Sequence, residues 1–344
     1  MADRHKLTWD VGPTISAKPL PDGVERMFIP SPDGMLEILV ALPASTGSGS
    51  GEERPPLLFV HGGFGSATCY INFLPFFASH GHPAYSLSLR GHGASHHPGF
   101  WKLYWTTKHT LALDIATAIT HIRHLHNITY PSTPTPNRQN GVILCGHSSG
   151  GGLSQYLISR SLETVGGLIT LAAVPGFGSY GVYYNWFVMD PWFAVRMYFR
   201  DLFHPRSPLS STTLVHRAFL GAGCPTELVK EVEEDMAETE SMMWPLGMMM
   251  QFVDPRRVVG GVAPALRCGR KVLVVAGSED RLMGVRIMAQ LAAWYRSALE
   301  CVSGRVEEGT DVVRFEEVKG SGHHLMRDVA WRECAGVMLE WLQK

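Results

Sequence analysis

One serine lies in a motif whose residue types and spacing suit nucleophilic catalysis. The motif, Gly-His-Ser-Ser-Gly at 146–150, follows the apolar run 142–145 and precedes residues 152–158, whose spacing is typical of a helix. At such a strand-to-helix turn the serine hydroxyl is exposed, and side chains in place of the glycines would collide with the neighbouring strand or helix. The helix N-terminus also presents a positive dipole end where an oxyanion would form. We therefore expect Ser148 to be a nucleophile rather than part of a plain glycine-rich turn.

With this motif the chain resembles the α/β-hydrolase family. Residues 61–66, His-Gly-Gly-Phe-Gly-Ser, look like the family's His-Gly loop, which lends a backbone N–H to an oxyanion hole. The resemblance implies donors at Gly63 or Phe64, and at Ser149, the residue after the nucleophile.

A second stretch, residues 90–95, looks like the family's Arg-Gly-x-Gly-x-Ser sequence, where the role is mainly structural. We therefore assign Arg90 and His92 no catalytic task.

The family's catalytic acid follows a buried strand, and the resemblance places it after the apolar run 271–276. Residues 277–280, Gly-Ser-Glu-Asp, are similar to the family's acid turn and point to Asp280. Glu279 is the competing carboxylate, one residue away and aimed in the other direction.

The family's base lies in a Gly-His loop after the last strand, which residues 320–326 resemble. The histidine directly after the glycine is the base, so the resemblance selects His323 over His324. In the implied reaction His323 takes the proton of Ser148, and Asp280 fixes the imidazole tautomer and stabilises the imidazolium. Because serine holds the nucleophile position, the branches of the family with an aspartate nucleophile are disfavoured.

The elements that must position these residues can be read from hydrophobic patterning. Near-continuous apolar runs predict strands buried on both faces of a mostly parallel sheet, and apolar residues at three- and four-residue spacing predict the helices that flank it. The fold class is therefore α/β, with an α/β-hydrolase fold. The expected strands are 35–42, 57–60, 84–89, 142–145, 168–174, 271–276 and 312–318, and the clearest helices are 111–125, 285–299 and 329–342.

Strand signals stop between residues 175 and 264, which predicts a helical lid inserted after the sixth strand. The expected domains are a first core part at 1–174, the lid at 175–264 and a second core part at 265–344. The lid holds eight of the chain's 15 methionines together with several aromatic residues. Methionine and aromatic side chains can line a pocket for a bulky apolar molecule. We expect substrate-binding residues among them at Trp186, Met189, Trp244 and Met248.

A glycine-free stretch at 227–244 suits one long helix, and the apolar lid could equally bury surface against a second copy of the chain, as a homodimer.

Composition excludes several function classes. The formal net charge of -1 gives no positive field for nucleic acid, and no apolar run approaches the length of a membrane span. The N-terminal residues carry no apolar leader segment, and the six cysteines are scattered without a CxxC pair. We therefore expect a cytoplasmic protein with free thiols. No metal cluster, phosphate loop or dinucleotide motif is present, so we expect no cofactor.

The leading interpretation is a serine hydrolase that acts on an ester, lactone or thioester of a bulky apolar molecule. An acyltransferase, a C–C bond hydrolase or a cyclase would use the same triad, and a non-catalytic ligand-binding protein could retain the fold. The overall texture of the sequence is also similar to hydrolases of fungal secondary metabolism.

Overall fold

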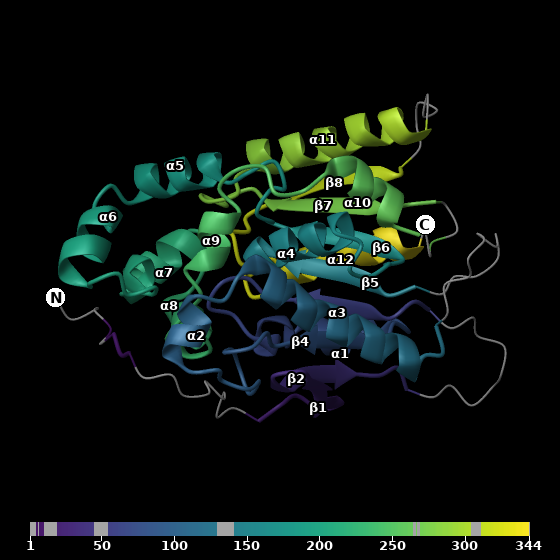
Figure 1. Cartoon of the computed structure of the whole chain (residues 1–344), viewed down its shortest axis with the longest axis horizontal. Helices are drawn as coiled ribbons and strands as arrows, with labels where there is room; N and C mark the ends of the chain where they lie inside the picture. Colours follow the sequence, from purple (N-terminus) through teal and green to yellow (C-terminus); the bar gives the residue numbers. More distant parts are fainter. Residues whose placement is uncertain are drawn as a thin grey trace.

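The computed structural model describes residues 5, 7–9, 19–44, 54–128, 141–263, 266, 269–303 and 311–343. Within these ranges eight strands form one sheet in the order β1-β2-β4-β3-β5-β6-β7-β8 (Figure 1). The pairs β1/β2 and β2/β4 are antiparallel, and the other pairs are parallel. The strands are β1 (Val24–Ser31), β2 (Gly34–Ala41), β3 (Leu57–Val60), β4 (Ala84–Leu87), β5 (Ile143–His147), β6 (Gly167–Leu171), β7 (Val272–Gly277) and β8 (Val313–Val318).

The central strands are buried along their whole length, as their apolar runs predict. Every residue of β3, β5, β6 and β7 is buried. Strand β1 was not expected, because its exposed positions carry charged residues such as Glu25 and its backbone includes Pro30. It pairs along its full length with β2 at the edge of the sheet.

Helices cover both faces of the sheet. Helix α1 contacts α12. A second row is formed by α3, α4, α10 (Pro255–Gly261) and α11, in which α3 contacts α4, α4 contacts α10 and α10 contacts α11. These helices are α1 (Phe73–Ser79), α2 (Phe100–Tyr104), α3 (Lys108–Leu125), α4 (Ser148–Ser159), α11 (Val285–Ser303) and α12 (Trp331–Gln343), with a short turn η1 (Ala67–Tyr70). Among the described helices, none has both the length and the apolar character that crossing a bilayer requires.

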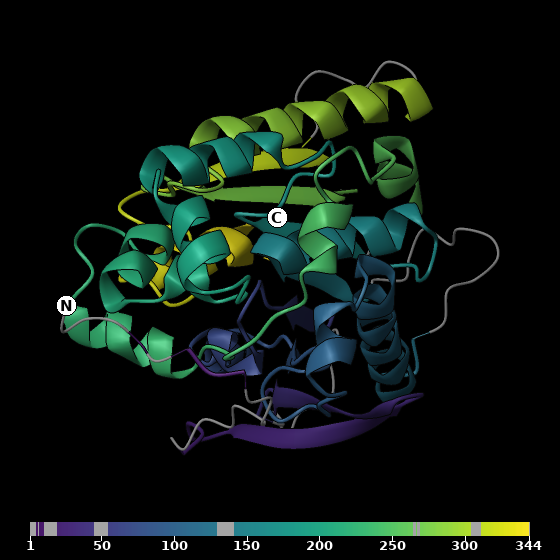
Figure 2. The same ribbon diagram turned by 60° about the vertical axis from the view of Figure 1, so that its left-hand side comes forward.

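The segment between β6 and β7, which we call the insert, is helical. Its helices up to α9 gather at the end of the sheet where the parallel strands finish (Figures 1 and 2). The predicted boundary at 264/265 lies outside the described residues. The helical elements of the insert are α5 (Tyr180–Met189), α6 (Phe193–Val195), η2 (Arg196–Arg200), η3 (Ser207–Leu209), α7 (Thr212–Phe219), α8 (Thr226–Glu234), α9 (Met243–Gly247) and α10 (Pro255–Gly261).

The prediction of one long helix over 227–244 is wrong. Helix α8 ends at Glu234 and α9 begins at Met243. The residues between them turn polar side chains toward the core: Glu240 accepts the Phe64 N–H at 2.9 Å, and the Ser241 hydroxyl donates to the Thr106 carbonyl at 2.5 Å. These long-range hydrogen bonds outweigh the local helix preference of the segment.

Candidate active site

Ser148 is the first residue of α4 and directly follows β5. Its φ of 50° lies in the left-handed region, which non-glycine residues rarely adopt. A Cβ on Gly146 would lie 2.6 Å from the Gly150 carbonyl oxygen, and a Cβ on Gly150 would overlap the His61 carbonyl oxygen. The steric reasoning for both glycines is therefore confirmed, and the turn presents a partly exposed serine at the end of a central strand.

His323 and Asp280 form a buried hydrogen-bonded pair. The distance from His323 Nδ1 to Asp280 Oδ2 is 2.9 Å, and the two side chains are 1% and 0% exposed. The other carboxylate oxygen accepts the backbone N–H groups of Leu282 at 2.7 Å and Met283 at 2.9 Å. Because an ionised carboxylate only accepts hydrogen bonds, Nδ1 carries the ring proton and Nε2 is left to accept one from a hydroxyl.

The competing residues at both positions face other partners. Glu279 Oε2 accepts the Ala222 N–H of the insert at 2.7 Å. The His324 ring stacks on Phe219 at 5.9 Å, and burial, then the charge of Arg327, lowers its pKa well below the ordinary histidine value. The geometry thus pairs Asp280 with His323, the two residues that the resemblance selected.

His147 ties the serine turn to the histidine loop. Its Nε2 donates to the His323 carbonyl oxygen at 2.9 Å, and the two rings lie 4.7 Å apart. Burial, then repulsion from His323, lowers the pKa of His147 well below its ordinary value, so this ring is neutral. Sequence reasoning missed this role, although the position of His147 directly before the serine was the available signal.

A buried carboxylate also holds the histidine loop in place. Asp328 Oδ2 accepts the N–H groups of Gly322 at 2.8 Å and of Gly221, from the insert, at 2.7 Å. The backbone on which His323 sits is therefore fixed from both the core and the insert.

The three expected oxyanion donors differ in availability. The Phe64 N–H donates to Glu240 Oε2 at 2.9 Å and is therefore occupied. The Gly63 N–H donates to no backbone carbonyl within the described ranges. Ser149 is the second residue of α4, so its N–H has no partner within the helix. Gly63 and Ser149 remain as the candidate donors.

Of the four residues expected to bind the substrate, two lie close to the serine turn and two lie on α5. Trp244 Cζ2 lies 3.3 Å from the position that a Cβ on Gly63 would take, and Met248 Sδ lies 3.0 Å from that position on Gly152 in α4. Both therefore pack on loops or helices next to Ser148. Trp186 and Met189 lie half-buried on α5, where the Trp186 ring faces Phe193 at 6.5 Å.

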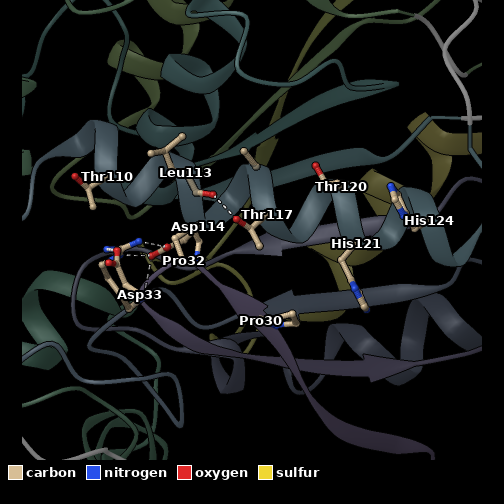
Figure 3. A pocket seen from close by; sticks show the side chains of 12 residues that line it. Pro30, Pro32, Asp33, Thr110, Leu113, Asp114, Thr117, Thr120, His121 and His124 are labelled. Atoms are coloured by element: carbon tan, nitrogen blue, oxygen red, sulfur yellow. Dashed lines mark hydrogen bonds and ion pairs between the residues drawn. The ribbon is translucent and has the colours of Figure 1, made fainter.

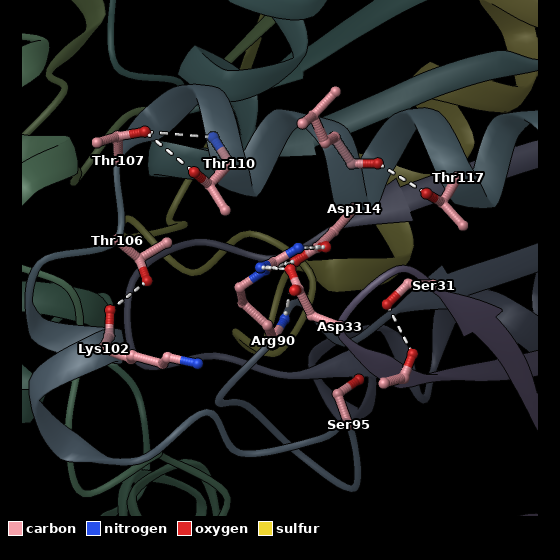
Figure 4. A network of polar contacts seen from close by, with 12 residues as sticks. Ser31, Asp33, Arg90, Ser95, Lys102, Thr106, Thr107, Thr110, Asp114 and Thr117 are labelled. Carbon is pink, nitrogen blue, oxygen red and sulfur yellow. Dashed lines mark hydrogen bonds and ion pairs between the residues drawn. The ribbon is translucent and has the colours of Figure 1, made fainter.

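A cavity of about 510 Å³ lies away from these residues. Most of its lining residues come from the turn that joins β1 to β2 and from helix α3 (Figure 3). On its wall Arg90 binds Asp114 and Asp33, each at 2.6 Å (Figure 4). Both ion pairs tie the loop after β4 to neighbouring elements, so this arginine is held outside the candidate active site.

Among the described residues, no group of three or more His, Cys, Asp or Glu side chains is arranged to hold a metal ion. The groups that the site itself offers for chemistry are a serine, an imidazole, a carboxylate and backbone N–H groups.

Comparison with known proteins identifies the family. The model of the alpha/beta hydrolase family matches residues 57–337, more than half of the chain. The chain therefore belongs to the α/β-hydrolase family, and the predicted fold class is confirmed. No curated protein matches the sequence significantly.

Three solved structures illustrate the likeness. A thermophilic esterase from Thermogutta terrifontis is 17% identical with a TM-score of 0.60, over 92% of this chain and 98% of that chain. Carboxylesterase CesB from Bacillus subtilis is 15% identical with a TM-score of 0.55, over 94% and 93%. The thioesterase domain from the curacin biosynthetic pathway is 15% identical with a TM-score of 0.54, over 92% and 100%. At these identities the likeness shows the fold alone.

Proposed function

We propose that the chain is a serine hydrolase that cleaves an ester, lactone or thioester of a bulky apolar small molecule through an acyl-enzyme at Ser148. The observation that carries this proposal is the buried bond between His323 and Asp280, which the hydrogen bond from His147 to the His323 carbonyl connects to the strained turn at Ser148. The esterases and the thioesterase with similar folds support the reaction class.

In the proposed reaction the Ser148 oxygen attacks the substrate carbonyl carbon while its proton passes to His323 Nε2. The negative charge moves to the carbonyl oxygen, to which the N–H groups of Gly63 and Ser149 donate hydrogen bonds. Such a donor contributes on the order of 3 kcal/mol in serine hydrolases. His323 then protonates the leaving group as the tetrahedral intermediate collapses to the acyl-enzyme. Water, deprotonated by the same histidine, releases the acid and restores the serine.

We propose that the insert is the lid and that its side chains contact the apolar part of the substrate. Trp244 over Gly63 and Met248 over α4 support this, because both are large, adaptable apolar groups beside the proposed reacting atoms. A site covered in this way also excludes water from the oxyanion, which strengthens its hydrogen bonds.

We further propose a cytoplasmic location. The five described cysteines are free, and four of them are buried, which fits a reducing compartment.

Hydrolysis of p-nitrophenyl esters of increasing acyl length tests the proposal. We expect turnover to rise from acetate toward longer chains, and Ser148→Ala to lower it by at least about 1,000-fold while the thermal midpoint stays near that of the parent chain. An added alcohol or amine acceptor separates hydrolysis from acyl transfer, because a transferase would form a new ester or amide. Ester turnover that survives Ser148→Ala would contradict the proposal.

A further inference from the structure

A buried carboxylate from the insert contacts the loop that carries the proposed oxyanion donor. Glu240 lies between α8 and α9, and its side chain is 5% exposed. Its Oε2 accepts the Phe64 N–H at 2.9 Å and faces His92 Nε2 at 3.1 Å, while Oε1 accepts the Ser241 N–H at 2.7 Å. A carboxylate is rarely so buried unless its oxygens are all satisfied, as they are here.

The hydrogen-bond partners define the protonation of this cluster. His92 Nδ1 faces the Arg90 carbonyl oxygen at 3.0 Å, and Nε2 faces the Glu240 carboxylate. Both partners are acceptors, so the ring donates from both nitrogens and is an imidazolium. Burial lowers the pKa of His92, but the charge of Glu240 and its hydrogen bond reverse this, so the pKa lies above the ordinary value.

The neighbouring His61 has the opposite state. Its Nδ1 donates to the Gly62 carbonyl oxygen at 2.7 Å and its Nε2 accepts the Leu89 N–H at 3.1 Å, which describes a neutral ring. Burial, then repulsion from His92, lowers its pKa to about 3. The cluster therefore holds one cation and one anion, and the pair is neutral overall.

The contacts of Phe64 connect this pair to the oxyanion loop. Phe64 has a φ of 61°, a left-handed conformation that is unfavourable for a non-glycine residue. The insert holds it on both sides: Glu240 accepts its N–H, and the Ala237 N–H donates to its carbonyl oxygen at 2.8 Å. The first bond orients the peptide that joins Gly63 to Phe64, and the second orients the peptide that joins Phe64 to Gly65. The Gly63 N–H belongs to the preceding peptide, so its direction is held through the backbone of Gly63.

We propose that Glu240 is a positioning residue for the oxyanion hole: acting through Phe64, it holds the Gly63 N–H in the direction that the tetrahedral oxyanion requires, and His92 keeps it ionised. The proposal rests on the proposed serine hydrolase function and adds a role for the insert beyond contact with the substrate. Removing the carboxylate should then weaken stabilisation of the transition state more than binding of the substrate.

Steady-state kinetics of Glu240 variants with the best p-nitrophenyl ester test this inference. For Glu240→Ala we expect kcat to fall about 10- to 100-fold with KM changed less than about threefold, because loss of a full oxyanion donor costs about 100- to 1,000-fold. The rate of phosphonylation by a fluorophosphonate should fall in parallel, since its P=O oxygen occupies the same hole. Glu231→Ala, at an exposed position of α8, is the matched control and should leave both rates unchanged.

Two conservative variants of Glu240 test the positioning role if Glu240→Ala does not fold. Glu240→Gln keeps an oxygen that can accept the Phe64 N–H, whereas Glu240→Asp keeps the charge but is one methylene too short to reach it. We therefore expect kcat in the order parent, Gln, Asp. Equal kcat values in the folded variants, or Asp above Gln, would overturn the positioning role. Absence of phosphonylation in the parent chain would instead overturn the proposed function itself.

Discussion

Two adjacent carboxylates at the end of β7 have different partners, although their sequence positions differ by one. Asp280 contacts the His323 ring, and Glu279 contacts a backbone N–H of the insert. At this turn, the position of a carboxylate therefore determines which partner it contacts, so the two carboxylates are not interchangeable. A carboxylate that orients an imidazole holds its tautomer, and this function is lost when an amide replaces it.

We predict that Asp280→Asn lowers kcat about 1,000- to 10,000-fold, because the amide can donate to Nδ1 and so favour the wrong tautomer. The matched variant Glu279→Gln retains an oxygen for the Ala222 N–H and should change kcat less than about threefold. Ester hydrolysis by the two purified variants provides the comparison. A larger loss in Glu279→Gln would show that the acid is misassigned.

Gly150 provides a test of packing at the serine turn. Gly150→Ala places a methyl group against the His61 carbonyl, so we predict a loss of about 1–3 kcal/mol in the free energy of unfolding. Gly336→Ala in α12 meets no atom within 4 Å and should instead stabilise the protein by about 0.5–1 kcal/mol. Urea denaturation followed by circular dichroism measures both; equal effects of the two substitutions would refute the steric explanation.

At the scale of elements, the local hydrophobic pattern predicts the strands that are buried on both faces. It does not predict segments whose conformation depends on contacts with distant residues. The runs of β3, β5 and β7 could be predicted because strands covered on both faces are apolar throughout. Strand β1 could not, since an edge strand with one solvated face carries charged residues.

The helix prediction for the segment between α8 and α9 was wrong because a distant contact determines its conformation. Its conformation depends on the hydrogen bond between Glu240 and Phe64, which lies 176 positions earlier in the chain. The residues around Glu240 do not indicate that this bond forms. Within the candidate site, Ser148, His323 and Asp280 could be named because glycine-containing turns surround them. The contact of Glu240 with Phe64 could not be predicted, because the two residues meet only once the chain is folded. The position of His147 directly before the serine was a signal for that residue, but it did not identify the His323 carbonyl as its partner.

At the scale of the whole molecule, the insert packs Trp244 beside Gly63 and Met248 beside Gly152 of α4, and elsewhere it exposes large apolar side chains. The exposed residues lie on α5 and the following turns, and they are Tyr184 (66%), Phe187 (53%), Trp192 (66%) and Phe199 (82%). Soluble proteins rarely leave such large apolar groups together in water. We propose a second copy of the chain as the partner that covers them.

We predict a mass in solution of twice the 37.9 kDa of one chain by light scattering after size-exclusion chromatography. Phe199→Asp should shift this mass toward that of the monomer, because a charge would be buried in the contact. A monomeric parent chain at micromolar concentration would contradict the proposed dimer.

Three distant segments of the chain, those of Ser148, Asp280 and His323, are proposed to act together to make the serine reactive. Covalent labelling of the serine is the direct test. The intact protein is treated with a fluorophosphonate, and the modified peptide is located by mass spectrometry. We expect a single phosphonyl group on Ser148, with labelling slowed by at least about 100-fold in His323→Ala and absent in Ser148→Ala. Labelling at another residue, or none under conditions where the chain is folded, would contradict it.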